Sequence, residues 1–170
     1  CIRDRLFGVA LQYTGGGQFF LNLAFSLLGY VRGGPAKVAI FASGLMGSMS
    51  GSVITNVLTT GALSIPAMKR IGFKPHVAGG VEACASTGGV LMPPIMGATA
   101  FIMAINLEVP YRDIVVAAVI PSVLYFFALF MQIDGYAAKN KLEGLPKVEL
   151  PTVSQTLKDG WYYVAVFALL

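Results

Sequence analysis

The sequence predicts an all-α integral membrane protein, and three observations lead to that fold class. Hydrophobic residues make up 56% and charged residues only 12% of the chain, and the mean hydropathy is +0.73. Such a composition suits lipid rather than water. The 12 basic residues fall between the apolar runs and form no basic stripe, so the net charge does not indicate nucleic acid. The basic residues are better explained as membrane topology signals.

Both ends of the chain look cut, so we expect residues 1–170 to be a fragment of one membrane domain. The first residues, "CIRDR", include neither an initiator Met nor the apolar core of a signal peptide. Residues 6–13 have the pattern of the end of a preceding helix, and the consecutive glycines at 15–17 are expected to terminate it. Residues 18–31 would span only about 21 Å against roughly 30 Å of hydrocarbon, which predicts a short interfacial helix.

The apolar run at 36–68 predicts a re-entrant helical hairpin over residues 35–70. One straight helix would be about 50 Å long, whereas two full spans need roughly 40 residues and a turn. The positive-inside rule places both basic flanks on the cytoplasmic side. We expect a first arm from Pro35 to about Met46 and a turn at 47–52. The flanking basic residues are Arg32, Lys37, Lys69, Arg70 and Lys74.

The expected turn, "GSMSGS", concentrates polar groups at membrane depth. Irregular backbone survives there only where it is buried in protein or lines a watery cavity. Glycines permit the turn, while serine hydroxyls and freed carbonyls supply neutral oxygens for a hard cation or a carboxylate ligand. The alternative is a Gly/Ser surface for helix packing, which is common in membrane bundles.

Residues 76–107 predict a second irregular feature, a transmembrane helix that is broken part-way. Fully helical, the run would be about 47 Å long. Pro93 and Pro94 are expected to break it, leaving the carbonyls of Gly89 and Val90 without helical donors. With Thr87 and Gly88 these carbonyls would form a second oxygen cluster; a simple proline kink is the alternative. Secondary transporters build midplane sites where a re-entrant tip meets a broken helix.

The remaining segments complete a multi-pass topology. A loop of mixed charge at 106–113 suits the outside, and residues 114–136 predict a transmembrane helix. The lysine-rich residues 139–159 form the next cytoplasmic loop. Residues 160–170 begin a further transmembrane helix with an interfacial aromatic anchor.

Three single residues have competing interpretations. Glu82, an acid inside an apolar run, could mark an ion or proton path or could complement the helix dipole. Asn56 lies four residues past Ser52 and could extend a site at the hairpin tip or bond a neighbouring helix. His76 is expected to be a solvated loop residue. Cys1 and Cys84 suggest neither a disulfide nor a metal site.

Neither a catalytic constellation nor a nucleotide-binding motif is present. The match to a nucleophile elbow at residues 47–51 has the wrong spacing, follows no strand and has no His-Asp pair. A Walker-type sequence is missing as well. The sequence therefore predicts a protein that is not an enzyme and that needs no cofactor.

The stretch from Gly33 to Ile102 looks like the large permease subunit of tripartite ATP-independent periplasmic (TRAP) transporters, and the resemblance runs from about Gly15 to the C-terminus. The motifs are "SGS…N…TTG…IPAMKR" and "EACASTGG…MPPIMGATAF", and the likeness is greatest to fused permeases that work with TAXI-type binding proteins. The resemblance implies half of an inverted-repeat elevator transporter. It also implies an ion and substrate site at Ser48, Ser50, Gly51, Ser52, Asn56, Ser86, Thr87, Gly88 and Gly89.

The resemblance further implies sodium-coupled import of an organic acid, a carboxylate, delivered by a periplasmic solute-binding protein. Na⁺ would lie at Ser50, Ser52, Thr87 and Gly89. The expected partners are a small permease subunit or its fused equivalent and the lipid bilayer of a bacterial or archaeal inner membrane. Two other functions stay open: an ion-coupled carboxylate symporter without a binding protein, and a non-transporting membrane scaffold.

Overall fold

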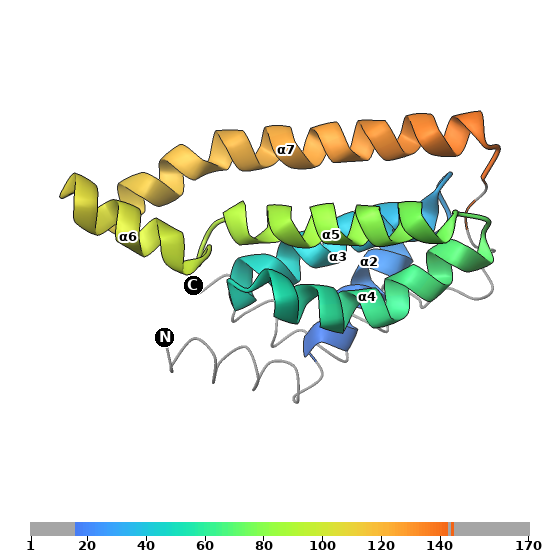
Figure 1. The fold of residues 1–170 in the computed structure, drawn as a ribbon, viewed down its shortest axis with the longest axis horizontal. Helices are drawn as coiled ribbons and strands as arrows, with labels where there is room; N and C mark the ends of the chain where they lie inside the picture. Colours follow the sequence, from blue (N-terminus) through green and yellow to red (C-terminus); the bar gives the residue numbers. More distant parts are fainter. Residues whose placement is uncertain (1–15, 143, 145–170) are drawn as a thin grey trace.

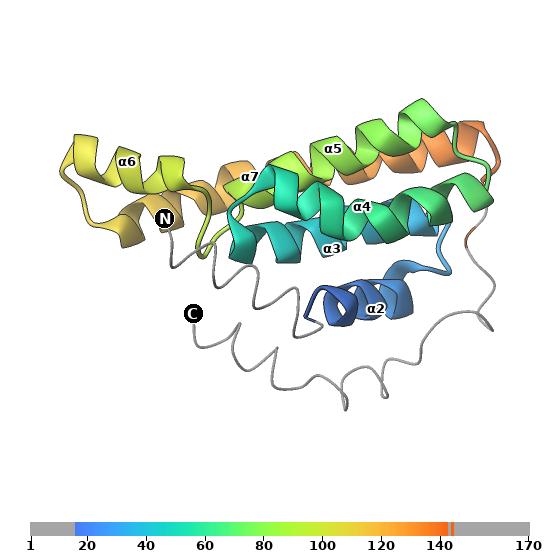
Figure 2. The same cartoon turned by 60° about the horizontal axis from the view of Figure 1, so that its bottom comes forward.

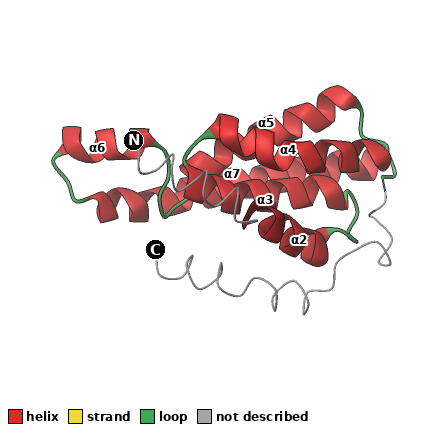
Figure 3. Ribbon diagram, turned by 90° about the horizontal axis from the view of Figure 1, so that it is seen from below, coloured by secondary structure: helices red, strands yellow, loops and turns green. Residues whose placement is uncertain are grey.

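A computed structural model describes residues 16–142 and 144, which form six α-helices joined by short loops and contain no strand (Figure 3). All-helical architecture is confirmed over this part of the chain. The predicted segment at 6–13, the helix start at 160–170 and most of the loop at 139–159 lie outside the described residues. The helices are α2 (Gly16–Leu28), α3 (Gly34–Ser50), α4 (Val53–Arg70), α5 (Pro75–Leu91), α6 (Ala98–Leu107) and α7 (Tyr111–Lys139).

Helix α3 is the centre of the fold. Most of its residues are buried, and it packs most extensively against α5, with α2 and α4 as further neighbours. Other helices approach α3 closely because several of its buried side chains are small, including those of Ala36, Ala39 and Ala42. Figure 2 shows α2 on one side of α3 and α5 with α7 on the other.

Helices α3 and α4 form a hairpin with a tighter turn than the sequence predicted. Gly51 ends α3 in the left-handed conformation (φ 60°), and its N–H donates to the carbonyl of Gly47 at 2.9 Å. Ser52 then caps α4 by accepting from the N–H of Thr55 at 3.4 Å. The predicted turn at 47–52 is wrong for residues 47–50, which are helical. Packing against neighbouring helices holds these small residues in α3.

The run at 76–107 is divided into α5 and α6 by an irregular segment at 92–97 that contains Pro93 and Pro94. The two carbonyls lack their usual helical donors, as expected, because residues 93 and 94 are prolines, but the expectation that these oxygens are unpaired is wrong. The carbonyl of Gly89 accepts from the N–H of Met92 at 3.2 Å, and that of Val90 accepts from the N–H of Gly97 at 3.1 Å. The N–H of Met92, just before the prolines, and the N–H of Gly97, where the chain folds back after them, replace the missing donors.

Helix α7 lies along the outer side of α5 (Figure 1). Among the described helices, it alone is both long and apolar enough to cross a membrane, with 29 residues and a hydropathy of 2.5 in its most apolar window. Two shorter segments, Phe19–Leu28 and Ala98–Leu107, are apolar but span fewer residues. In Figure 1, α6 extends beyond the end of α5 and accompanies the first turns of α7.

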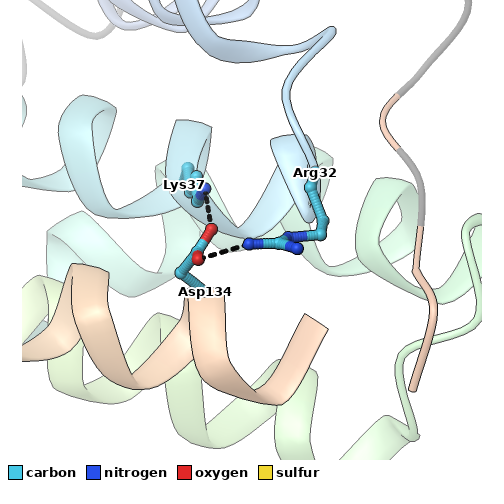
Figure 4. A network of polar contacts seen from close by, with 3 residues as sticks. All are labelled: Arg32, Lys37 and Asp134. Atoms are coloured by element: carbon cyan, nitrogen blue, oxygen red, sulfur yellow. Dashed lines mark hydrogen bonds and ion pairs between the residues drawn. The ribbon is translucent and has the colours of Figure 1, made fainter. Parts of the chain in front are cut away.

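An ion-pair network fastens the start of α3 to the end of α7. The Nζ of Lys37 lies 2.5 Å from one carboxylate oxygen of Asp134, and the guanidinium of Arg32 lies 2.7 Å from the other (Figure 4). The Lys37 side chain is only 3% exposed, and its ammonium also faces the ring of Phe130 at 4.7 Å. A buried ammonium needs such a partner, because an unpaired charge in the interior is strongly destabilising.

Asp134→Asn should lower the melting temperature of the purified protein, because it leaves the buried ammonium of Lys37 without its anion. The double variant Lys37→Met with Asp134→Leu should recover most of that loss, since it removes both charges. Differential scanning fluorimetry measures the melting temperatures of the single and the double variant. Arg112→Gln is the control, because the Arg112–Asp113 pair is 87% and 58% exposed and contributes little. A wild-type melting temperature for Asp134→Asn would contradict the structural role of the network.

Candidate functional site at the hairpin tip and the helix break

The tip of the α3–α4 hairpin touches the irregular segment between α5 and α6. A Cβ placed on Gly51 would lie 2.5 Å from the carbonyl oxygen of Met96, and one on Gly97 would lie 3.5 Å from the carbonyl oxygen of Gly51. Gly51 therefore meets two requirements, a left-handed turn and close backbone contact. The two irregular features that the sequence predicted separately are neighbours in the fold.

One turn below the tip, α3 and α5 cross at a pair of glycines. A Cβ on Gly47 would lie 2.7 Å from the Cα of Gly89, and a Cβ on Gly89 would lie 2.4 Å from the carbonyl oxygen of Ser43. No side chain fits between the two backbones at this point. The "GSMSGS" segment thus serves helix packing through Gly47 and the turn through Gly51.

Asn56 closes this crossing from α4. Its side chain is fully buried, and its Nδ2 donates to the carbonyl of Ser43 at 2.9 Å, so the interpretation as a bond to a neighbouring helix is confirmed. Among buried side chains in the described part of the chain, the Oδ1 of Asn56 is the polar atom that has no hydrogen-bond partner. Such an atom calls for an explanation, and a bound ion or water is a common one.

The hydroxyls of the three predicted hairpin serines differ in the hydrogen bonds that they already make. Ser48 is buried and its hydroxyl donates to the carbonyl of Leu45 at 2.8 Å, within its own helix. The hydroxyl of Ser50 accepts a long hydrogen bond of 3.5 Å from the N–H of Ser52. Ser52 accepts from Thr55 as the α4 cap. Ser50 and Ser52 lie at the tip, whereas Ser48 bonds along α3.

The predicted residues of α5 do not gather at one place. Ser86 is buried and its hydroxyl donates to Glu82 at 3.3 Å. Thr87 lies on the exposed side of α5 and donates to the carbonyl of Ala83 at 2.8 Å. Gly88 packs against α7, because a Cβ there would lie 2.4 Å from the ring of Tyr125. Of this set, Gly89 contacts the hairpin directly, at Gly47.

A polar cluster between α3, α4 and α5 surrounds Glu82, which is fully buried. Hydroxyls of Thr60 and Ser64 contact its two carboxyl oxygens in short hydrogen bonds, and the Ser43 hydroxyl lies 3.1 Å from Oε1. Together with Ser86, these side chains surround one carboxyl group inside the helix bundle. Glu82 lies beyond the first turn of α5, so a dipole interaction with the helix start does not explain it.

Sequence reasoning considered Glu82 but missed its partners. Asn56, Thr60 and Ser64 recur every four residues and form one polar stripe on α4. That spacing was a usable signal, since a buried polar stripe on one helix needs polar groups on the facing helix. On α5, Glu82 and Ser86 have the same spacing.

The family described as "Tripartite ATP-independent periplasmic transporter, DctM component" matches residues 5–170. The chain belongs to this family. The resemblance to TRAP large permeases is thereby confirmed over nearly the whole chain.

Curated relatives include transporter permeases with several substrate names. The C4-dicarboxylate TRAP transporter large permease protein DctM of Pseudomonas aeruginosa is 30% identical over 142 residues, which cover 83% of this chain and 33% of that protein. The sialic acid TRAP transporter permease protein SiaT of Haemophilus influenzae is 29% identical over 159 residues, 94% of this chain and 26% of that protein. The chain therefore matches about a quarter to a third of the length of these relatives.

Gly89→Ala should destabilise the TRAP permease by about 1–3 kcal/mol, because the added methyl group forces α3 and α5 apart. Thermal or denaturant unfolding in detergent measures the loss. Gly80→Ala is the matched control on the same helix, where a Cβ meets nothing within 4 Å; it should be neutral or stabilising by up to about 1 kcal/mol. If Gly89→Ala and Gly80→Ala changed the stability equally, α3 and α5 would not be in tight contact at Gly89.

Proposed function

We propose that this chain contributes the first re-entrant hairpin and the following broken helix to a sodium-coupled TRAP permease that imports an organic acid. The observation that carries the proposal is the contact of the hairpin tip, at Gly51, with the break at Met96 and Gly97. This is the pairing of irregular segments by which secondary transporters form midplane sites. Membership of the TRAP family supports the same function.

The position of the tip along α7 supports a re-entrant hairpin. The base of the hairpin binds α7 near its carboxyl end, through Lys37 and Asp134. Next to the tip, Met96 lines a cavity of about 530 Å³ together with Pro121 and Ser122, close to the middle of α7. If α7 spans the membrane, a hairpin that starts at one end of α7 and turns near its middle penetrates about half-way.

Oxygen atoms at the tip fit Na⁺ in part. Asn56 contributes a buried Oδ1 without a partner, and Ser50 contributes a hydroxyl that makes only a long hydrogen bond in the described structure. Ser52 and the carbonyl of Gly89 already accept one hydrogen bond each, but each oxygen has a second lone pair. Thr87 would have to leave its bond to Ala83 to join them. We therefore propose Na⁺ at Ser50, Ser52 and Gly89, with Asn56 as a further ligand and Thr87 recruited on binding.

Proposed partners and substrate follow from the family. Its description names a periplasmic, tripartite system, so we propose a periplasmic solute-binding protein of the TAXI type and a small permease subunit or fused equivalent. C4-dicarboxylate, sialic acid and isethionate appear in the names of relatives, and all are organic acids. The second, inverted half of the site would lie in the rest of an elevator-type permease in the inner membrane.

Gly51→Leu should abolish uptake while leaving membrane insertion intact. Leucine is strained at the φ of 60° that Gly51 adopts, and its Cβ would lie 2.5 Å from the Met96 carbonyl oxygen, so the hairpin tip would be forced away from the helix break. Uptake of radiolabelled substrate and membrane yield are measured together. Gly79→Leu is the control, since a Cβ there meets nothing within 4 Å. Normal sodium-coupled uptake by Gly51→Leu would refute the assignment of the tip.

Ser50→Ala and Asn56→Ala should each raise the Na⁺ concentration that gives half-maximal uptake. The increase is roughly tenfold for each 1.4 kcal/mol of Na⁺-binding free energy that the variant loses. Uptake is measured in proteoliposomes with an inward Na⁺ gradient, with and without the binding protein. Thr87→Ala tests its recruitment, and Thr59→Ala, whose hydroxyl donates to Thr55 on its own helix, is the control.

The other outcomes of this uptake experiment would reassign the function. Uptake without any binding protein would favour a self-sufficient carboxylate symporter. Uptake indifferent to Na⁺ would remove the ion from the tip. No uptake by wild type under any condition, with normal folding, would favour a membrane scaffold.

A further inference from the structure

The hydroxyls around Glu82 do not carry enough hydrogen atoms for their contacts. Six oxygen pairs lie within hydrogen-bond range: Ser43–Thr60, Ser43–Glu82, Thr60–Glu82, Ser64–Glu82, Ser86–Glu82 and Thr60 with the carbonyl of Asn56. Each pair needs one hydrogen between its oxygens, and each serine or threonine supplies one. Four hydroxyls therefore serve six contacts if the carboxylate is ionised.

Thr60 shows the shortage most clearly. Its Oγ1 lies 2.8 Å from the carbonyl oxygen of Asn56 and makes a short contact with Oε1 of Glu82. A carbonyl and an ionised carboxylate both only accept hydrogen bonds, and Thr60 has one hydrogen. With an ionised Glu82, the single hydrogen of Thr60 would have to serve both of these close oxygen pairs.

A proton on Oε1 of Glu82 resolves the arrangement. The carboxyl then donates to Thr60, and Thr60 donates to the Asn56 carbonyl. The hydroxyl of Ser43, 3.1 Å from both Thr60 Oγ1 and Glu82 Oε1, shares its hydrogen between them. Ser64 and Ser86 donate to the carboxyl oxygens. Five hydrogens then serve the six contacts, and only the hydrogen of Ser43 is shared between two acceptors.

The charges around Glu82 agree with a neutral carboxyl. From α3 and α4, Ser43, Thr60 and Ser64 face it, and Ser86 faces it from its own helix. In the described structure no ion pair involves Glu82. The buried cation of α3, Lys37, pairs with Asp134, and His76 at the start of α5 is exposed. On α4, the basic residues Lys69 and Arg70 are exposed at its carboxyl end. A buried carboxylate without a cation is strongly disfavoured.

We propose that Glu82 is a proton-binding site: in the packed arrangement of α3, α4 and α5 its carboxyl carries a proton and donates it in a hydrogen bond to Thr60. The site is separate from the proposed sodium ligands, none of which contacts Glu82. It does not depend on sodium coupling.

Infrared difference spectroscopy of the intact permease in lipid, at neutral pH and in sodium-free buffer, tests the proposal. The wild-type spectrum should contain the C=O stretching band of a protonated carboxyl, and Glu82→Gln should lose that band. Glu108→Gln is the matched control, since Glu108 is exposed and should contribute only carboxylate bands. Loss of carboxylate bands instead of the C=O band in Glu82→Gln would overturn the proposal.

Thr60→Val supplies a second variant that keeps Glu82. Removal of the acceptor should shift the C=O band of Glu82 or replace it with carboxylate bands, whereas Thr59→Val, one residue away, should leave the band in place. An unmoved band in Thr60→Val would show that the carboxyl proton is not donated to Thr60. Because the readout is spectroscopic, it does not require transport, so its outcome is distinguishable from a failure of sodium-coupled uptake.

Discussion

The close approach of α3 and α5 at Gly47 and Gly89 is the constraint on which the rest of the structure depends. With no side chain at the crossing, the two backbones meet, and α4 can bond both helices at once. Asn56 reaches the Ser43 carbonyl and Thr60 reaches Glu82 because of this spacing. Polar groups are thus enclosed between three helices instead of facing lipid, where they would lack partners.

Helix α7 stabilises this unit from one side through contacts at three places along its length. At its end Asp134 binds Lys37, in its middle Tyr125 packs on Gly88 and donates to the Cys84 carbonyl at 2.9 Å, and at its start Tyr111 donates to the carbonyls of Pro94 and Ile95. The opposite face of α7 exposes large apolar side chains, including Val116, Ile120 and Phe127. A helix with one anchored face and one apolar face suits the border between protein and lipid.

Much of the architecture could be predicted from the sequence, because length and basic flanks limit how apolar runs can fold. The hairpin arms and the interrupted helix follow from comparing the length of each apolar run with the thickness of the membrane. The turn was less predictable, since glycine and serine are compatible with a packed helix, and only Gly51 has the left-handed φ that marks the end of α3. The hydrogen bond from Gly97 to the Val90 carbonyl depends on how the chain folds back after Pro94, which no local pattern encodes. The position of Thr87 on the opposite side of α5 from Glu82 did follow from helix geometry and was overlooked.

The four-residue spacing of Asn56, Thr60 and Ser64 has a consequence for how this segment can vary in length. Successive residues of a helix are about 100° apart around its axis. One residue inserted between Asn56 and Ser64 would turn whatever follows away from Glu82, and the same insertion in α5 between Glu82 and Gly89 would misplace the glycine crossing. Insertions and deletions within these two helices are therefore far more disruptive than substitutions on their outer faces.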